Sequence, residues 1–354
     1  MKNNIHIDLI IPIRVYSDNI YILNRLLKIL EFFVLYKNLG IIVVDSSEKI
    51  KYRQEILQKI SNFSNVKYLY YKINNIYSAA KARNFGVKNS SSKYILFYDV
   101  DLLVSDLFIK KIFEDIQKIE NNKKKNLFFI YPCLYLSENF TRSIEKYNQI
   151  NFSEIKKSYL EGFNDKVLYL AVSTSTILVN KEHFIKIGMY DENFKGHGYE
   201  DFELIHRLYL NYVSCKIDED YLIDFKTNFP AKYKGFRKYF AYMALPNFFR
   251  DMYTIHLWHP RPLSKKYYKV RKKNQKYFLR KISLDLKKYQ YNKNENLMLY
   301  DKFIEDLLNE FDTSLYCGLY KYNDSVNPPK KTMKRKLRKL LLNPIQFFKD
   351  IKLK

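Results

Sequence analysis

The sequence predicts an α/β fold in which helices cover a mainly parallel sheet. Short apolar runs at 7–12, 41–44, 66–70 and 94–98 each have the length and residue types of a buried strand. Segments with helical spacing of apolar residues separate these runs, and the connections are short. Polar side chains follow the runs, at the strand ends where open α/β sheets bind ligands. These observations indicate a doubly wound arrangement.

The first half of the chain is expected to alternate strand and helix. After the first strand, Ser17 is expected to cap a helix that continues to about Lys37 and is ended by Gly40. Its apolar residues recur on one face (Ile20, Leu23, Leu27, Leu30, Val34). The elements expected next are a strand at 41–44, a helix near 49–60, a strand at 66–70, a short helix capped by Ser78, a strand ending at Asp99, and a helix from 105 to about 119.

The second half has a different pattern. Strands are expected at Leu127–Tyr131 and Leu168–Val179, with a loop and a helix in the polar stretch between them. A loop with two glycines then leads into a helix that continues to about Tyr212. Beyond Pro262 the chain is rich in Lys and Tyr, and it is expected to be helical to about Phe311, before the break at Asn327-Pro328-Pro329.

Composition narrows the class of protein. Hydrophobic residues make up 47% of the 354, which is enough for a full core. Cys133, Cys215 and Cys317 are far apart and odd in number, which indicates a reducing compartment. The polar N-terminus leads straight into a strand, so no signal peptide is expected. No apolar stretch of about 20 residues is present, so no membrane span is expected.

The net charge of +25 permits nucleic-acid binding, but the distribution of that charge argues against it. Residues 328–354 carry ten Lys and Arg against one Asp, and a second basic stretch lies near 265–288. The remaining residues mix bases with acids, so no nucleic-acid partner is predicted. A non-enzymatic protein that binds polyanions remains an alternative, because the chain also holds 33 tyrosines.

The apolar run at 94–98 ends in Asp99-Val100-Asp101, two carboxylates one residue apart. Two acids at one strand end repel each other unless a cation joins them. Oxygen ligands suit Mg²⁺ or Mn²⁺, and such an ion commonly carries a diphosphate. The alternative is a turn with solvated aspartates, because a three-residue pattern is weak by itself.

A second acidic pair, Glu200-Asp201, follows two glycines and opens a helix. Glycine lets the backbone approach a ligand, and the helix N-terminus stabilises negative charge. An aspartate that faces the metal site could therefore act as a general base on an acceptor hydroxyl. The alternative is a capping cluster, since acids are common in first helical turns.

Two histidines follow a short apolar segment, His256 and His259. Their spacing on a strand end predicts that they point differently, so that one of them, with His256 preferred, completes a metal site. A structural role is the alternative for either histidine. Three further positions are candidates beside the metal. Arg83 could pair with a diphosphate or with Asp99, and Arg14 and Asp45 follow the first two strands.

In order and spacing, these motifs resemble GT-A glycosyltransferases, specifically family-2-like enzymes with a galactosyltransferase-type C-terminal region. The resemblance covers about residues 7–262 and includes a lead-in to the second acidic pair, Gly188-Met-Tyr190-Asp191-Glu192-Asn-Phe194. The matching motifs are Ile11-Pro12-Ile13-Arg14, Val43-Val44-Asp45-Ser46-Ser47, Ala82-Arg83-Asn84-Phe85-Gly86, Asp99-Val-Asp101 and Gly196-His-Gly198-Tyr-Glu200-Asp201. The fold that it implies is a mixed, mainly parallel sheet flanked by helices, with a C-terminal helical extension.

The resemblance also implies roles for nucleotide-binding residues. Pro12, Arg14 and Asp45 are expected to lie along a nucleotide, with Asp45 near the uracil. Arg83 is expected near the ribose and diphosphate, and Asp99 near the ribose or a metal-bound water. The implied donor is a UDP-sugar.

Catalytic roles are implied for the acidic pairs and the histidines. Asp101 is expected to ligate Mn²⁺ or Mg²⁺ together with one histidine, and Asp201 to be the base of an inverting displacement. Glu200 is expected to hold sugar hydroxyls. The metal neutralises charge on the departing diphosphate.

The sequence departs from the family pattern at two places. His197 stands where relatives usually have Trp, and Ser173-Thr174-Ser175 replaces Gly-Gly-Ser. Both changes affect expected sugar specificity, so the sugar is left open among galactose, N-acetylgalactosamine and N-acetylglucosamine.

The resemblance divides the chain into a GT-A catalytic domain at 1–262, a helical extension at 263–327 and a basic tail at 328–354. Within the catalytic domain, 1–125 is expected to bind the nucleotide and 126–262 the acceptor. Met333, Leu337, Leu340 and Leu341 share one helical face of the tail, which suits an anionic membrane surface. A solvated helix or a docking segment for another protein is the alternative.

The sequence therefore predicts a metal-dependent, inverting transferase that moves a hexose or N-acetylhexosamine from a UDP-sugar to a glycan or lipid-linked glycan acceptor. Its expected place is bacterial capsule or surface-polysaccharide synthesis, in the cytoplasm at the inner leaflet of the membrane. A sugar-nucleotide pyrophosphorylase is an alternative, disfavoured because no Gly-rich phosphate loop follows the first strand.

Overall fold

The computed structural model describes residues 6–121, 123–161, 165–226, 233–261 and 266–293. It also describes five separate positions near the C-terminus: Leu337, Leu340, Leu341, Pro344 and Phe348. The predicted helix from 294 to Phe311, the break at Asn327-Pro329 and the rest of the basic tail lie outside the described residues. The division of the chain at 262 and 327 therefore stays a prediction.

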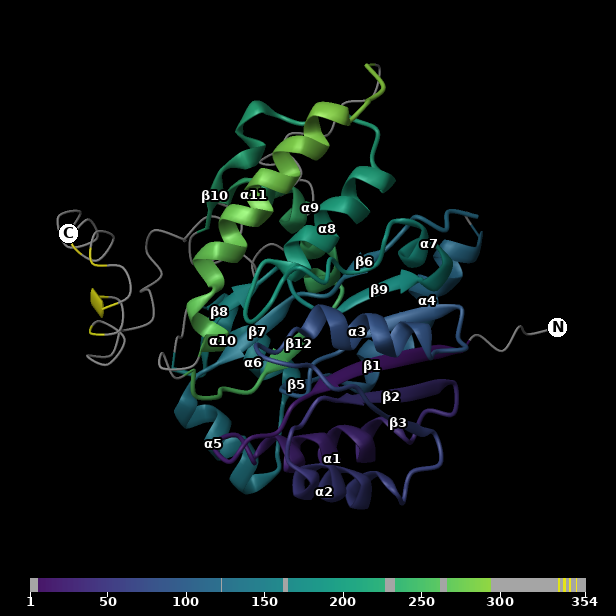
Figure 1. The fold of residues 1–354 in the computed structure, drawn as a ribbon, viewed down its shortest axis with the longest axis vertical. Helices are drawn as coiled ribbons and strands as arrows, with labels where there is room; N and C mark the ends of the chain where they lie inside the picture. The colour runs from purple at the N-terminus through teal and green to yellow at the C-terminus, as the bar shows by residue number, and fades with distance from the viewer. Residues whose placement is uncertain are drawn as a thin grey trace.

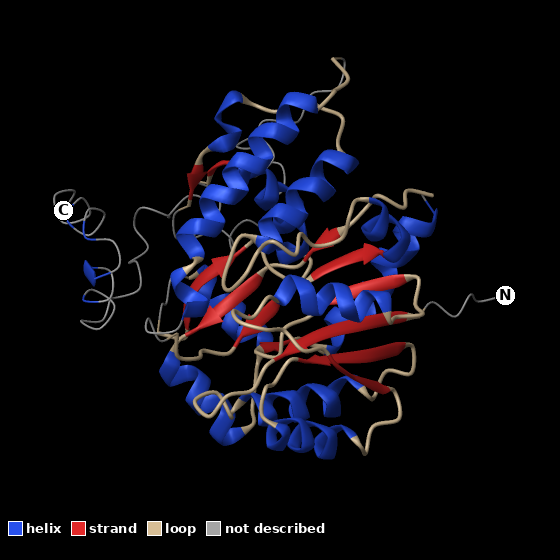
Figure 2. Ribbon diagram, viewed as in Figure 1, coloured by secondary structure: helices blue, strands red, loops and turns tan. Residues whose placement is uncertain are grey.

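A six-stranded mixed sheet forms the centre of the molecule (Figures 1 and 2). Its strand order is β3-β2-β1-β4-β9-β6, in which the first four strands run parallel and β9 runs antiparallel to both neighbours. Every residue of β1 is buried, as expected for a strand covered on both faces. The strands are β1 (Ile7–Ile13), β2 (Leu39–Asp45), β3 (Val66–Tyr70), β4 (Tyr94–Phe97), β6 (Phe129–Ile130) and β9 (Ile177–Asn180).

Two hydrophobic cores cover the two faces of this sheet. Leu9 and Ile11 of β1 lie in the core formed with α1 (Ile22–Phe33), α2 (Ile50–Ile60) and α4 (Asp106–Asn121). Ile10 points to the opposite core, which it shares with α3, because side chains alternate along a strand. The helices of the second core are α3 (Ala79–Lys88), α6 (Phe152–Leu160), α7 (Lys181–Lys186), α8 (Glu200–Tyr212), α9 (Phe236–Phe249) and α11 (Arg271–Lys288).

Helix α3 comes close to the sheet at Gly86. A Cβ added there would lie 2.6 Å from Ile10 Cγ2 and 3.0 Å from Val44 Cγ2. The helix begins where the sequence predicts, because the Ser78 side chain accepts a hydrogen bond from the Lys81 backbone NH. Arg83 is thereby fixed one turn into the helix, beside the carboxyl ends of the strands.

A second sheet of four strands lies beside the first. Its order is β5-β12-β7-β8, with β12 parallel to β7 and antiparallel to β5. The register pairs His256 of β12 with Leu102 of β5, and the Leu257 NH donates to the Asp101 carbonyl at 2.9 Å. The segment that carries His256 and His259 is therefore held against the segment that carries Asp99 and Asp101. The strands are β5 (Leu102–Leu103), β7 (Cys133–Leu136), β8 (Val167–Ala171) and β12 (Thr254–His256).

Three expectations about local structure are wrong. The run Leu168–Val179 is two strands, β8 and β9, which belong to different sheets. The polar stretch after β7 holds two helices, α5 (Glu138–Tyr147) and α6, rather than one. Ser17 caps no helix, because Asn19 closes a turn by accepting from the Tyr16 NH and donating to the Arg14 carbonyl, so α1 begins only at Ile22. The helix also ends at Phe33 and not near Lys37, and Gly40 lies in β2.

The helices predicted beyond Pro262 are present up to residue 288. They are α10 (Lys266–Lys269) and α11, and α11 packs against α8 through Phe278 and Ile282. The remaining short elements are η1 (Glu219–Leu222), β10 (Asp224–Phe225) and β11 (Lys234–Gly235). Within the described ranges, no helix combines the length and hydropathy needed to cross a bilayer.

Candidate active site

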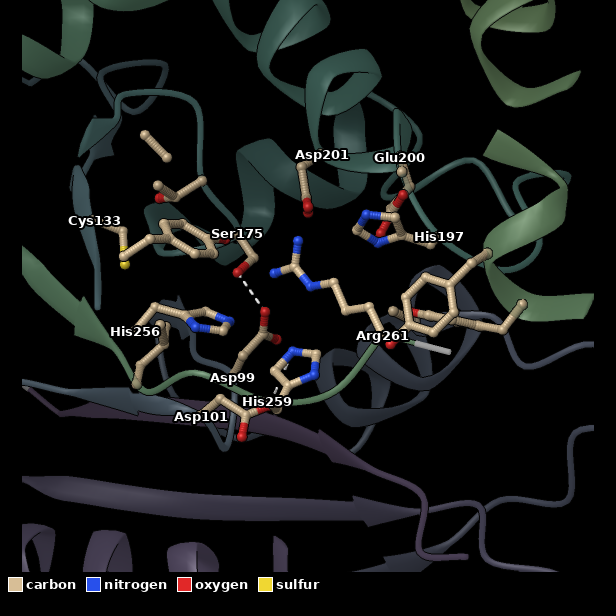
Figure 3. Close-up of a pocket in the computed structure, with 18 of the residues that line it drawn as sticks. Asp99, Asp101, Cys133, Ser175, His197, Glu200, Asp201, His256, His259 and Arg261 are labelled. Atoms are coloured by element: carbon tan, nitrogen blue, oxygen red, sulfur yellow. Dashed lines mark hydrogen bonds and ion pairs between the residues drawn. The ribbon is translucent and has the colours of Figure 1, made fainter. Parts of the chain in front are cut away.

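A cavity with a volume of about 910 Å³ lies at the carboxyl ends of β1 and β4, beside the second sheet. Its wall draws on both halves of the chain (Figure 3). The sequence-predicted residues that line it are Pro12, Arg14, Arg83, Asp99, Asp101, Glu200, Asp201, His256 and His259. Asp45 is the one predicted site residue that is not part of this wall.

Arg83 joins the two acidic pairs. Its Nη2 donates to Asp99 Oδ1 and its Nη1 donates to Asp201 Oδ1, both at 2.9 Å. The side chain is 2% exposed, so water screens these charges weakly. Burial lowers the pKa of Arg83, but Asp201, Tyr190 and Asp99 outweigh that effect and raise it well above its ordinary value. The guanidinium is therefore permanently charged between the two carboxylates.

Asp201 and Glu200 open α8. The preceding residues have left-handed backbone, with φ of 97° at Gly198 and 76° at Tyr199, and this turn directs the helix N-terminus at the cavity. Burial raises the pKa of Asp201, and Arg83 opposes that rise. Burial, followed by the charge of Asp201, raises the pKa of Glu200 to about 8. The two neighbouring carboxyls therefore both hold their protons more strongly than exposed acids do.

Asp101, His256 and His259 form a cluster that fits a metal ion. One ligand atom from each lies within 4.8 Å of the others. His256 is buried, and its Nδ1 has no hydrogen-bond partner within the described part of the chain. Burial also lowers the pKa of both imidazoles, which leaves them neutral and able to donate a lone pair. One carboxylate and two imidazoles suit Mn²⁺, and Mg²⁺ prefers more oxygen ligands.

The structure brings both histidines to this cluster, where the sequence argued for one. The imidazole centroids are 5.3 Å apart, and His259 Nε2 lies 3.9 Å from Asp101 Oδ2. Asp99 is not part of the cluster, because its oxygens accept from Arg83 and from the Ser175 hydroxyl at 2.6 Å. The two aspartates of the Asp99-Val-Asp101 motif therefore have different partners.

Arg25 is a site residue that the sequence analysis missed. Its guanidinium donates to Asp101 Oδ1, to Glu145 Oε1 at 2.8 Å and to the Trp258 carbonyl at 2.8 Å. It thereby fixes Asp101 relative to the histidine segment and leaves the second Asp101 oxygen facing His259. The sequence feature that could have revealed Arg25 is its place between Leu23 and Leu26 on the buried face of α1, since a charge there needs a partner.

Of the residues predicted to bind the nucleotide, Arg14 lines the cavity and Asp45 does not. Arg14 lines the cavity, with its guanidinium 5.2 Å from the Tyr16 ring centroid and 5.8 Å from that of Tyr77. The Asp45 side chain is fully buried, and it accepts hydrogen bonds from the Tyr68 hydroxyl and the Ser47 NH. The structure thus gives Asp45 partners within the protein, away from the cavity.

The two departures from the family pattern both lie at the cavity. Ser175 orients Asp99, and Thr174 Oγ1 donates to the Tyr131 carbonyl at 2.7 Å, so this segment connects the second sheet to the site. His197 lies beside Tyr267 and Tyr268, with ring centroids 6.0 and 5.5 Å away. Aromatic rings of the helical extension therefore occupy the surroundings of His197.

The family model described as glycosyltransferase like family 2 matches residues 8–284. The match covers most of the chain and every residue of the cavity wall discussed above. This chain belongs to that glycosyltransferase family. The predicted GT-A fold class, with a mixed and mainly parallel sheet between helices, is confirmed.

Solved structures that match this glycosyltransferase include three of S. aureus TarS. TarS 1-349 has 18% identity and a TM-score of 0.36, and the match covers 58% of this chain and 56% of that chain. A longer TarS structure has 19% identity and a TM-score of 0.35, and the match covers 58% of this chain and 34% of that chain. TarS 1-349 in complex with UDP has 18% identity and a TM-score of 0.35, and the match covers 58% of this chain and 56% of that chain. The matched part is at most 56% of the length of these relatives. No curated protein matches the chain.

The family assignment favours the predicted transferase over the two alternatives raised by the sequence, a pyrophosphorylase and a polyanion-binding scaffold. In this glycosyltransferase, one cavity combines a metal-ligand cluster, a charged bridge and an acidic pair. Arg25, outside the motifs, and Tyr190, in the lead-in to the second acidic pair, support these groups. Tyr190 donates its hydroxyl to Asp201 Oδ1 at 3.2 Å.

Proposed function

We propose that this glycosyltransferase moves a hexose or N-acetylhexosamine from a UDP-sugar to a hydroxyl of a glycan, with inversion at the anomeric carbon. The observation that carries the proposal is that Asp201, half-buried at a helix N-terminus, and the Asp101–His256–His259 cluster line one cavity. A base and a site for the leaving diphosphate are the two parts that a single displacement needs.

Asp201 is the proposed base. It accepts the proton of the acceptor hydroxyl, the hydroxyl oxygen bonds to the anomeric carbon, and the bond from that carbon to the diphosphate oxygen breaks to release UDP. Burial raises the pKa of Asp201 and so strengthens it as a base, and the Arg83 charge opposes that rise. The protonated Glu200 beside it can donate a hydrogen bond to a sugar oxygen.

Mn²⁺ or Mg²⁺ held by Asp101, His256 and His259 would neutralise charge on the departing diphosphate. Arg25 is the positioning residue for this cluster, because it holds Asp101 against the segment after β12. Asp99, fixed by Arg83 and Ser175, faces the ribose side in this proposal. Pro12 and Arg14 line the nucleotide side of the cavity.

UDP-galactose, UDP-N-acetylgalactosamine and UDP-N-acetylglucosamine are the proposed donors, and bacterial capsule or surface polysaccharide is the proposed product. A lipid-linked acceptor would place the enzyme at the inner leaflet of the membrane, in the cytoplasm. Exposed apolar side chains at Leu337, Leu341 and Phe348, within the basic tail, support a contact with anionic lipid. Sedimentation with anionic vesicles, compared with neutral ones, tests that contact.

The test of the reaction is UDP release from a panel of UDP-sugars, with and without Mn²⁺. We expect manganese-dependent release from one donor by the wild type, and none by Asp101→Ala. Asp106→Ala is the matched control, because Asp106 is an exposed residue of the following helix. Equal release by Asp101→Ala and by the wild type would contradict the proposal.

A further inference from the structure

Besides Arg14, Arg83 and Lys269, four basic side chains line the cavity. Lys226 follows β10, Arg237 begins α9, Arg261 follows β12 and Arg271 begins α11. We call these four residues the basic wall. Figure 3 shows Arg261 pointing from its segment into the cavity. Because four separate elements contribute to it, the basic wall is a product of the fold and not of one charged stretch.

A stack of rings connects the basic wall to the metal-ligand cluster. The Lys226 ammonium lies 5.3 Å from the Tyr169 ring centroid, and Tyr169 stacks on Tyr135 at 4.6 Å. Tyr135 in turn stacks on His256 at 4.2 Å, and the Arg261 guanidinium lies 5.6 Å from the Tyr135 centroid. The basic wall and the cluster are therefore parts of one continuous surface.

The charge of the basic wall is only partly compensated. Asp224 pairs with Arg237 at 2.5 Å, and it also accepts from the Tyr199 hydroxyl and the Gln275 amide. Across the described ranges, no carboxylate forms an ion pair with Lys226, Arg261 or Arg271. Burial, followed by the charges of Arg237 and Arg271, lowers the pKa of Lys226 to about 8. Among the described residues, these three cations thus line the cavity without a carboxylate paired to them, an arrangement that a bound anion would stabilise.

The basic wall flanks the residues on either side of the acidic pair. Arg271 lies 4.8 Å from the Tyr199 ring centroid, and Arg237 lies 4.7 Å from that of Phe202. Tyr199 precedes Glu200-Asp201 and Phe202 follows it, so these two cations contact the residues on either side of the acidic pair. The molecule that gives its proton to Asp201 is the acceptor, and the basic wall lines the cavity that the acceptor enters.

We propose that the basic wall binds a phosphate group of the acceptor, so that this glycosyltransferase acts on a phosphorylated or phosphate-linked glycan. The inference rests on the proposed function and specifies its acceptor. A phosphate offers three oxygens and up to two charges, and arginine binds it through two parallel hydrogen bonds. A carboxylate would satisfy only one of the three uncompensated cations. The donor diphosphate is the other source of phosphate, and the experiment separates the two.

The experiment is a calorimetric titration of inorganic phosphate into protein saturated with UDP and Mn²⁺, so that the donor site is filled. Wild type, Lys226→Met and the double variant Lys226→Met/Arg271→Met are compared, with acetate as a carboxylate probe. The double variant Lys276→Met/Lys287→Met is the matched control, since both lysines are exposed on α11. UDP affinity is measured for every protein, and circular dichroism checks its folding.

We expect wild type and control to bind phosphate more tightly than acetate, and the Lys226→Met/Arg271→Met variant to lose about tenfold in phosphate affinity or more. UDP affinity should change by less than about twofold in each protein. The single variant Lys226→Met, with a smaller loss, gives the test if the double variant does not fold.

Phosphate binding that is unchanged in the variants, or absent in the wild type, would overturn the inference. A parallel loss of UDP and phosphate affinity would also overturn it, because it would assign the basic wall to the donor diphosphate. A wild type that binds no UDP would instead remove the proposed function, and the inference with it.

Discussion

Arg83 Nη1 lies 2.9 Å from Asp201 Oδ1, and this ion pair connects helix α3 to helix α8 across 118 residues of sequence. The same guanidinium holds Asp99 at 2.9 Å, so one buried cation sets the positions of two carboxylates. Removal of this cation changes both the stability of the fold and the charge of the proposed base.

Arg83→Met should lower the free energy of unfolding by about 3 kcal/mol or more, because it leaves two acids near each other without a buried counter-charge. Chemical denaturation at neutral pH measures the loss. Arg142→Met is the control, since Arg142 pairs with Glu138 on the surface of α5 and that pair should contribute about 1 kcal/mol at most. Equal losses in the two variants would show that the Arg83 bridge is not a stabilising feature.

Asp201→Asn should reduce sugar transfer by about 10²- to 10⁴-fold and leave UDP affinity unchanged, because it removes a base and not a nucleotide contact. The measurement is steady-state transfer together with UDP calorimetry on the same protein. Asp106→Asn makes the same chemical change at an exposed position and should behave as wild type. Transfer by Asp201→Asn at the wild-type rate would remove Asp201 from the mechanism.

The raised pKa of Glu200 predicts that the stability of the fold depends on pH. Its pKa is raised from 4.5 to about 8 in the fold, so between these values the folded protein binds more protons than the unfolded chain. The stabilising effect is complete below about pH 4.5 and is lost as the pH rises through about 8.

The unfolding free energy of the wild type should therefore fall relative to Glu200→Gln between about pH 5 and pH 8, by on the order of 2 kcal/mol. Urea denaturation across that range measures the difference. Glu114→Gln, at an exposed position of α4, should follow the wild type at every pH. A constant difference between wild type and Glu200→Gln would contradict the raised pKa.

His256→Ala and His259→Ala should each weaken Mn²⁺ binding by about tenfold or more, because each removes one of three ligands. Manganese titration followed by electron paramagnetic resonance measures affinity without turnover. His6→Ala, at an exposed position before β1, should leave affinity unchanged. If only one of the two site variants lost affinity, the metal would have a single histidine ligand, as the sequence suggested.

Much of the fold could be predicted because local pattern and tertiary structure agree in the first half. Strand 66–70 and the Ser78 cap are where the sequence places them. The second half was harder, because Leu168–Val179 reads as one apolar run. Its residues 172–176 carry the chain from one sheet to another, and a run of strand-forming residues does not reveal such a crossing.

The motif residues of the site converge as the sequence predicts, with the exception of Asp45. Their partners could not be predicted, since Arg25 meets Asp101 across 76 residues and Arg83 meets Asp201 across 118. Pairings of this kind depend on how helices pack and not on local pattern. The basic wall could not be predicted from the sequence either, because its four residues come from four separate elements.

The most direct test of the proposed site is a calorimetric titration of UDP into the full chain with and without Mn²⁺, repeated on Asp101→Ala. We predict UDP binding that requires Mn²⁺ in the wild type and is lost in the variant. Equal UDP affinity with and without Mn²⁺, in both the wild type and Asp101→Ala, would contradict the metal-centred site. An absence of UDP binding in the wild type would contradict the proposed UDP-sugar donor.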